Sequence, residues 1–193
     1  MDHSPLSLRR ATEHDHDSIV ALIDRAAEWL HTKNTDQWAQ PWPSERDRSH
    51  RIRRDLRAGK TWVATAGRAL IATLTADSED SPVWPKESRG NPAVYVCRLV
   101  VSRTHAGEGL GAAFLDWAGL RARHRYNAQW VRVDVWTTNK ALHAYYRDRG
   151  FEFYGLSEEV DDDYPSAALF QKPTERISAP DHVLFQLTPR GNR

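Results

Sequence analysis

The chain has 193 residues and a formal net charge of +1, from 27 basic and 26 acidic side chains. This length fits one large domain that folds without a disulfide or a metal, and 40% hydrophobic residues exclude a collagen-like or wholly disordered chain. The near-neutral charge argues against a dedicated nucleic-acid-binding protein. The single cysteine, Cys97, excludes an intramolecular disulfide and fits a reducing compartment.

The N-terminal sequence lacks the apolar segment of a signal peptide, and no run approaches the roughly 18 apolar residues of a membrane span. We therefore expect a soluble, cytoplasmic protein without a membrane partner. Arginine outnumbers lysine by 22 to 5, which favours a GC-rich and hence bacterial genome.

The predicted elements begin with a short strand at 6–10 and a helix whose apolar residues repeat at helical spacing between Ile19 and Leu30. A loop at 31–43, broken by prolines, separates this helix from a basic helix at 44–58, which we interpret as solvated surface. The remaining predicted elements are a hairpin of strands at 61–66 and 69–77, a loop at 78–92, a strand at 93–101, a helix over 110–120, a strand at 130–136, a helix at 139–150, and strands at 151–156, 166–172 and, as a further candidate, 182–187.

This order of elements is β–α–α–β–β–β–α–β–α–β–β, which is typical of a domain that packs helices on a sheet. The strands at 93–101 and 130–136 are joined by a helix, so they should be parallel, whereas the hairpin before them must be antiparallel. We therefore expect a mixed sheet with helices on both faces.

A glycine-rich turn follows the strand that ends near Val101. Gly107, Gly109 and Gly111 lead directly into a helix, whose first N–H groups and positive dipole end favour an anion such as pyrophosphate. The spacing matches neither the dinucleotide-binding fingerprint nor the kinase-type phosphate loop. Because such turns also occur with purely structural roles, the turn by itself favours phosphate binding only modestly.

A second block follows the next strand and contains Asn139, Tyr146, Gly150 and Phe151. With the glycine turn, this block resembles the GNAT superfamily of acyl-CoA-dependent N-acyltransferases, whose members have asparagine, tyrosine and Gly-Phe at these spacings. The resemblance covers about residues 6–172, and the family's phosphate loop aligns with 106–111. Ala106 stands where the family usually has glutamine or arginine.

The resemblance implies an α/β (α+β) fold with a mixed, mostly antiparallel central sheet, one splayed parallel strand pair and helices on both faces. It implies a single N-acetyltransferase domain over 1–193, with a core at 6–172 and a C-terminal extension at 173–193 that holds the candidate extra strand. We expect a monomer or homodimer that uses acetyl-CoA, with no metal and no nucleic-acid partner.

In the family, the pantetheine arm of the cofactor lies in the gap beside the splayed strand. The resemblance therefore implies that Leu99 and Val101 offer main-chain groups to pantetheine, that Asn139 hydrogen-bonds nearby, and that Tyr146 faces the thioester sulfur. The implied cofactor-binding residues are Leu99, Val100, Val101, Ala106, Gly107, Glu108, Gly109, Leu110, Gly111, Ala112, Asn139 and Tyr146.

The implied chemistry needs a proton donor and a proton acceptor. Tyrosine has an ordinary pKa of about 10, so Tyr146 can donate a proton to the departing thiolate. The strand at 93–101 lacks the carboxylate that many members use as a base, which leaves Asp134 on the facing strand as one option. Pairing of Asp134 with Arg132 or Thr138 is an equally weighted alternative, and we expect Tyr145 to be a core residue.

Acceptor specificity in the family comes from the first two helices, their connecting loop and later loops. Aromatic residues gather there beside Glu28, Asp36 and the acidic run 158–163, a combination that suits a cationic amine. The alternative is that the tryptophans pin the loop to the core. The predicted substrate-binding residues are Trp29, Trp38, Trp42, Trp136 and Tyr164.

The sequence thus predicts an N-acetyltransferase that transfers an acetyl group from acetyl-CoA to a primary amine of a small molecule, by direct attack in a ternary complex. Two alternatives stay open: a catalytically weak acyl-CoA-binding or sensing module, and an acetyltransferase of a peptide or protein amine. The sequence names neither the acceptor nor the acyl group.

Overall fold

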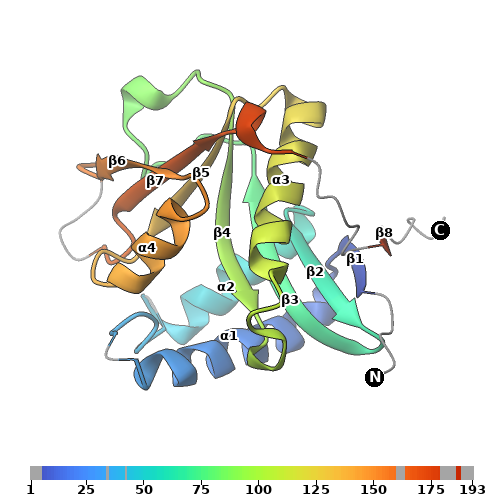
Figure 1. Ribbon diagram of the computed structural model, residues 1–193. Coiled ribbons are helices and arrows are strands. Elements are labelled where there is room, and N and C mark those ends of the chain that lie inside the picture. Colours follow the sequence, from blue (N-terminus) through green and yellow to red (C-terminus); the bar gives the residue numbers. More distant parts are fainter. Residues whose placement is uncertain (1–5, 34, 42, 160–163, 179–185, 188–193) are drawn as a thin grey trace.

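The computed structural model describes residues 6–33, 35–41, 43–159, 164–178, 186 and 187 (Figure 1). Helices and strands occur in the predicted order. They are β1 (Leu6–Arg10), α1 (His16–His31), α2 (Glu45–Arg57), β2 (Thr61–Ala66), β3 (Ala69–Asp77), β4 (Ala93–Val101), α3 (Leu110–Tyr126), β5 (Trp130–Val135), α4 (Lys140–Arg147), β6 (Glu152–Leu156), β7 (Ala168–Pro173) and β8 (Gln186–Leu187).

The strands form one eight-stranded sheet in the order β6-β7-β5-β4-β3-β2-β1-β8. β4 and β5 are parallel, as predicted, and the contacts from β3 to β4 and from β5 to β7 are antiparallel. The expected splayed parallel pair is therefore confirmed, and the short β8 adds a second parallel contact, with β1, at the edge of the sheet. The candidate strand at 182–187 therefore contributes two described residues at the edge of the sheet.

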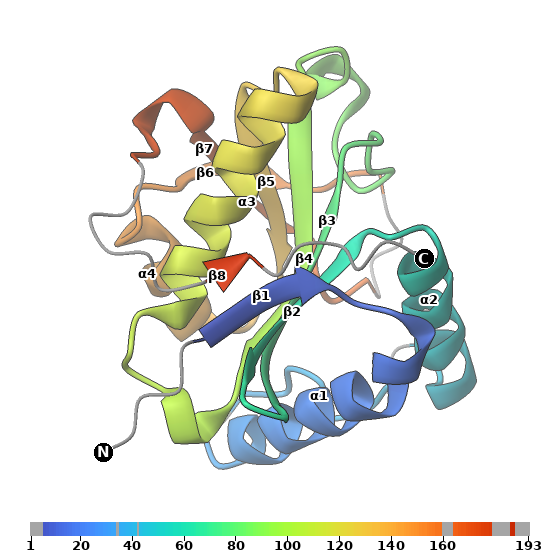
Figure 2. The same ribbon diagram turned by 90° about the vertical axis from the view of Figure 1, so that its right-hand side faces the viewer.

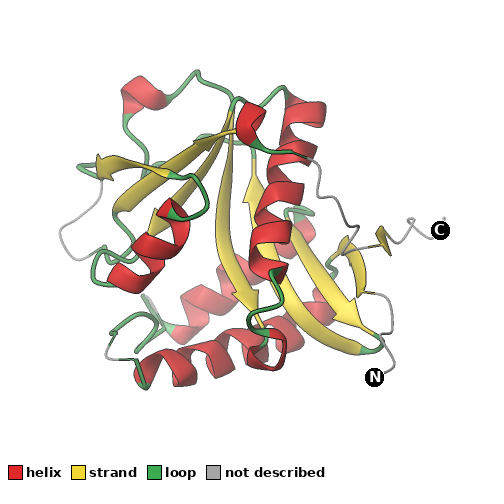
Figure 3. Ribbon diagram, in the orientation of Figure 1, coloured by secondary structure: helices red, strands yellow, loops and turns green. Residues whose placement is uncertain are grey.

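Helices cover both faces of this sheet (Figure 3). Phe114 of α3 and Tyr146 of α4 belong to one hydrophobic core, and Ile19 of α1 and Ile52 of α2 belong to another. Figure 2 shows α3 and α4 on one side of the strands and α2 on the other. None of the helices in the described part of the chain has the length and apolar character to cross a bilayer.

β4 and β5 separate soon after they begin. They pair only from Ala93 with Trp130 to Tyr95 with Arg132, and Figure 1 shows them diverging beyond these ends. β4 continues along β3 as far as Val101, while β5 continues along β7. The edge of β4 after Tyr95 therefore faces a widening gap, which is the predicted splayed pair.

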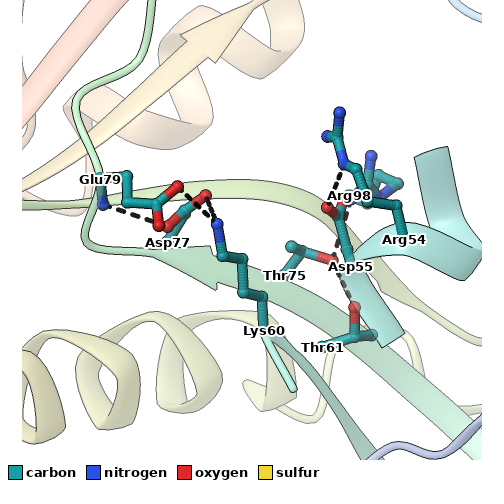
Figure 4. A network of polar contacts seen from close by, with 8 residues as sticks. All are labelled: Arg54, Asp55, Lys60, Thr61, Thr75, Asp77, Glu79 and Arg98. Carbon is teal, nitrogen blue, oxygen red and sulfur yellow. Dashed lines mark hydrogen bonds and ion pairs between the residues drawn. The ribbon is translucent and has the colours of Figure 1, made fainter. Parts of the chain in front are cut away.

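A bulge in β4 lies in the part of the strand that has separated from β5. Thr75 pairs with Cys97 and Thr73 with Val100, so Arg98 and the residue after it lie opposite a single residue of β3. Arg98 has a φ of 51°, unusual for a residue other than glycine. Its guanidinium donates to Asp55 of α2 and, at 3.3 Å, to Thr75 Oγ1 (Figure 4). Because bulges bend a strand and increase its twist, we infer that this contact contributes to the separation of β4 from β5.

Candidate active site

A cavity of about 410 Å³ occupies the gap between β4 and β5. From the α3 and α4 side it is lined by Gly111, Tyr145 and Tyr146, and from the α1 and α2 side by Ile23 and the arginines of α2. The cavity is therefore lined from both faces of the sheet, so two molecules that approach from opposite faces can meet inside it.

The glycine turn has positive φ angles at two of its glycines. Gly107 and Gly109 have φ angles of 87° and 75°, and Gly109 is the N-cap residue of α3. A Cβ at either position would meet no heavy atom within 4 Å, so the backbone angle is what favours glycine there. Ala106 and Glu108 are exposed, and α3 begins at Leu110. Its first N–H groups lack partners within the helix and form a surface for an anion.

Gly111 is required for a different reason. A Cβ at this helical position would lie 2.7 Å from the Tyr145 hydroxyl. The prediction that Tyr145 is a core residue therefore needs correction, because its ring packs beside the core but it also lines the cavity and its hydroxyl reaches the start of α3. The Arg149 guanidinium lies 3.5 Å from the centre of this ring, and burial raises the pKa of the phenol.

Tyr146 lines the cavity from α4 and is 7% exposed. Its ring packs edge-on against Phe151, with the ring centres 5.2 Å apart, and stacks on Phe170. Burial is the largest cause of a strong rise in the pKa of Tyr146, so its phenol holds its proton at neutral pH.

Asn139 caps α4 instead of facing the cavity. Its side-chain oxygen accepts from the Leu142 N–H at 2.9 Å, and its Nδ2 donates to Gln37 Oε1 in the loop after α1. Gln37 and Asn139 are both buried. Both polar atoms of the Asn139 side chain therefore form hydrogen bonds within the protein. An asparagine at this position is explained locally, because it caps α4.

Asp134 reaches the cavity from β5. Neither partner suggested by the sequence pairs with it, because Arg132 donates to Ser88 O and Tyr95 Oη, while Thr138 donates to Asp36. Burial raises the pKa of Asp134, and hydrogen bonds from Ser166 and Tyr164 partly oppose the rise. Burial also raises the pKa of the neighbouring Cys97 thiol, which makes it a poor nucleophile.

The predicted acceptor residues do not all gather in the cavity. Trp38, Trp136 and Tyr164 line it. The Trp136 Nε1 donates to Asp36 at 3.0 Å, which ties the loop after α1 to the end of β5. Trp29 lies in a separate hollow with Glu28, with the Arg103 guanidinium 3.9 Å from its ring centre. Trp42 and residues 160–163 of the acidic run lie outside the described residues.

Arginines are the residues of the cavity that sequence reasoning missed. Arg48 and Arg51 of α2 line it together with Arg98, so the interpretation of this helix as solvated surface is wrong for one of its faces. Ile52 and Asp55 are buried on α2, and each lies four residues after one of the two helix arginines. Helical spacing therefore places Arg48 and Arg51 on the buried face, and of these two neighbours only the apolar Ile52 indicates that face in the sequence.

No group of three or more His, Cys, Asp or Glu side chains is arranged to hold a metal ion within the described part of the chain. The expectation that the protein needs no metal stays a prediction.

The fold and the cavity define a class. Two parallel strands splay beside a glycine-rich helix start, and a buried tyrosine faces their gap, as the resemblance to the acyl-CoA-dependent N-acyltransferases implies. A model of the acetyltransferase (GNAT) family matches residues 23–151. The chain belongs to this family, and it is an acyltransferase.

Comparisons with individual proteins agree. The chain is 34% identical over 149 residues to the uncharacterized N-acetyltransferase YesJ of Bacillus subtilis (strain 168), which covers 75% of this chain and 81% of the relative. A GNAT acetyltransferase of Listeria monocytogenes 4b F2365 shares the fold with a TM-score of 0.69 and 22% identity, over 87% of this chain and 94% of that one. The PaiA N-acetyltransferase of Thermoplasma acidophilum, solved in complex with coenzyme A, gives a TM-score of 0.65 and 14% identity, over 87% and 98% of the two chains.

Proposed function

We propose that this protein transfers an acetyl group from acetyl-CoA to a primary amine of a small molecule, by direct attack in a ternary complex. The observation that carries the proposal is the cavity in the β4–β5 gap, which is lined from both faces of the sheet and contains Tyr146 and Asp134. A donor and an acceptor entering from opposite faces would meet between these two side chains.

The acyl donor is proposed to enter from the α3 and α4 face. The N–H groups from Gly107 to Ala112 would bind its pyrophosphate. Ser102 N–H donates to Ile71 O of β3 at 2.7 Å, so the alternation of strand backbone turns the main-chain groups of Val101 towards the gap. Val101, and Leu99 beside the bulge, would pair with pantetheine. Val100 belongs to the core on the α1 and α2 face and is not part of the proposed site.

The proposed reaction forms one C–N bond and breaks one C–S bond. The neutral amine attacks the thioester carbonyl, and a backbone N–H near Leu99 stabilises the oxyanion. The C–S bond then breaks, and the thiolate takes the proton of Tyr146. Asp134 takes the proton that the amine loses. Burial supports both roles, because it keeps the proton on the phenol and strengthens the carboxylate as a base.

Initial-rate kinetics test this proposal. Thiol release from acetyl-CoA is measured against a panel of amines, with acetyl-CoA affinity measured separately by calorimetry. We expect amine-dependent release and intersecting double-reciprocal lines, as in a ternary complex. Parallel lines with an isolable acetyl-enzyme would contradict direct attack. Saturable binding of acetyl-CoA without transfer to any amine would contradict the enzymatic function.

A further inference from the structure

Arginine side chains line the α2 side of the cavity. Arg48 and Arg51 project from one face of α2, and Arg98 projects from the bulge of β4. Among the described residues that line the cavity, Asp134 is the only carboxylate, and it lies across the gap on β5. This distribution is opposite to the one that suits a cationic acceptor.

Two of these arginines form ion pairs with carboxylates that do not line the cavity. Arg48 Nη1 lies 2.7 Å from Asp24 Oδ1 of α1, and Arg98 pairs with the buried Asp55. Such ion pairs hold the guanidinium groups in place before a ligand arrives, which lowers the entropy lost on binding. The arginines are therefore a preorganised part of the wall.

Arg51 lines the cavity together with Arg98. Burial and the charge of Arg98 lower the pKa of Arg51, while Tyr164 and Asp47 oppose the shift. Tyr164 interacts electrostatically with Arg51 and Arg98 on one side and with Asp134 on the other. Tyr164 lines the cavity together with these three residues.

A molecule with an ammonium group at one end and an anion at the other matches this polarity. Its amine would approach Asp134, which the proposed reaction requires for deprotonation. Its anion would lie near Arg51, whose planar guanidinium binds carboxylates and phosphates through paired hydrogen bonds. A polyamine would instead place a second cation against the arginines.

We propose that the acceptor of this enzyme is an amine that carries an anionic group, a carboxylate or a phosphate, and that Arg51 binds this group with Arg98 contributing to the positive potential. The inference rests on the proposed acetyl transfer and names the class of its acceptor.

Matched pairs of amines test the charge preference. The panel contains the L-amino acids with their amides, β-alanine with β-alaninamide, phosphoethanolamine with ethanolamine, and 1,4-diaminobutane as a dication. We expect the best acceptor to be an anionic member that exceeds its uncharged partner about tenfold or more in kcat/KM, since a hydrogen bond to a charged group contributes at least that factor. The amino-acid and phosphate pairs identify which anion is preferred.

The outcomes separate this inference from the proposed function. Transfer that is best to an uncharged amine or to diaminobutane overturns the anionic acceptor and leaves acetyl transfer standing. Transfer to no member of the panel, despite tight acetyl-CoA binding, overturns both.

Arg51→Gln locates the anion site, with Arg46→Gln as the control. Arg46 is an exposed arginine of the same helix and does not line the cavity. We expect Arg51→Gln to raise KM for the anionic acceptor about tenfold and to leave its uncharged partner and acetyl-CoA affinity unchanged. The control should keep the wild-type preference. A loss of acetyl-CoA affinity with an unchanged acceptor preference would assign Arg51 to the donor and overturn the inference. The matched-pair test on the wild-type protein does not depend on either variant folding.

Discussion

Substitution of Asp55 by asparagine tests what holds the bulge of β4. Asp55 is 6% exposed and pairs with Arg98 and with Arg54, whose Nε lies 3.2 Å away. The variant removes the charge that offsets the burial of the Arg98 guanidinium. Breaking a buried ion pair costs about 3–5 kcal/mol. The Arg98 side chain is 22% exposed and asparagine keeps one oxygen acceptor, so we expect a loss of about 2–3 kcal/mol.

The same variant should weaken acyl-donor binding. A left-handed backbone at a residue other than glycine costs about 1–2 kcal/mol, and the contact with Asp55 is what favours that conformation at Arg98. Without it, the bulge relaxes and the edge of β4 moves relative to β5. Asp24→Asn is the control, because Asp24 also forms an ion pair with an arginine, Arg48 at 2.7 Å, but its carboxylate is 47% exposed. That loss should be about 0–1 kcal/mol.

Urea denaturation followed by circular dichroism gives the free energies of unfolding, and calorimetry gives the acetyl-CoA affinities. If Asp55→Asn lowers the free energy of unfolding no more than Asp24→Asn does and binds acetyl-CoA as the wild type does, then Asp55 does not hold the bulge of β4.

Three further tests concern the cavity, each with its own readout. Tyr146→Phe should lower kcat about 10²–10⁴-fold in steady-state assays, which is the usual contribution of a general acid. Tyr145→Phe should stay within a few-fold of the wild-type kcat. The reverse result would make Tyr145 the proton donor. Gly111→Ala should destabilise the protein by about 1–3 kcal/mol through overpacking, because its Cβ would lie 2.7 Å from the Tyr145 hydroxyl, and the added Tyr145→Phe change should restore stability in urea denaturation. Trp38→Ala should raise the acceptor KM and leave acetyl-CoA affinity unchanged. A fall in acetyl-CoA affinity alone would show that Trp38 contacts the donor instead of the acceptor.

Much of the fold could be predicted because periodicity and turn residues report on local structure. The apolar face from Ile19 to Ile23 is buried as expected, and the helix between β4 and β5 required the parallel pair. The bulge was not predictable in this way. Arg98 lies in a strand of otherwise apolar residues, and only its contact with Asp55, far away in the sequence, favours its backbone.

The candidate site was predicted less completely than the fold. Family spacing points to Tyr146, which lines the cavity, and to Asn139, whose side chain caps α4 and whose contact with the cofactor stays a prediction. The arginines of α2 were missed because a basic helix is usually a solvated one. Which face of a helix meets a cavity depends on how the helices pack, and the positions of Ile52 and Asp55 carried that information only weakly.

Asp134 links the stability of the protein to its proposed activity. Burial raises the pKa of Asp134 in the folded state above its ordinary value of about 3.9. Over the pH range between the two values, the folded protein binds more protons than the unfolded chain, so stability falls as pH rises. The charge on Asp134 therefore lowers the stability of the folded protein at neutral pH. A base at this position requires that charge.

Asp134→Asn should thus be more stable than wild type at pH 7 and less active. The gain in stability should be present above the folded-state pKa and should vanish as pH falls below about 3.9, where the wild-type carboxyl is protonated in both states. Loss of the base should lower kcat about 10²–10⁴-fold, and raising the pH should recover part of it by deprotonating the amine in solution. Urea denaturation of both proteins across this pH range measures the first effect, and kcat–pH profiles measure the second. A variant that is less stable at pH 7 would mean that the hydrogen bonds from Ser166 and Tyr164 outweigh burial. Unchanged kcat would remove Asp134 from the reaction and leave the amine to lose its proton through water.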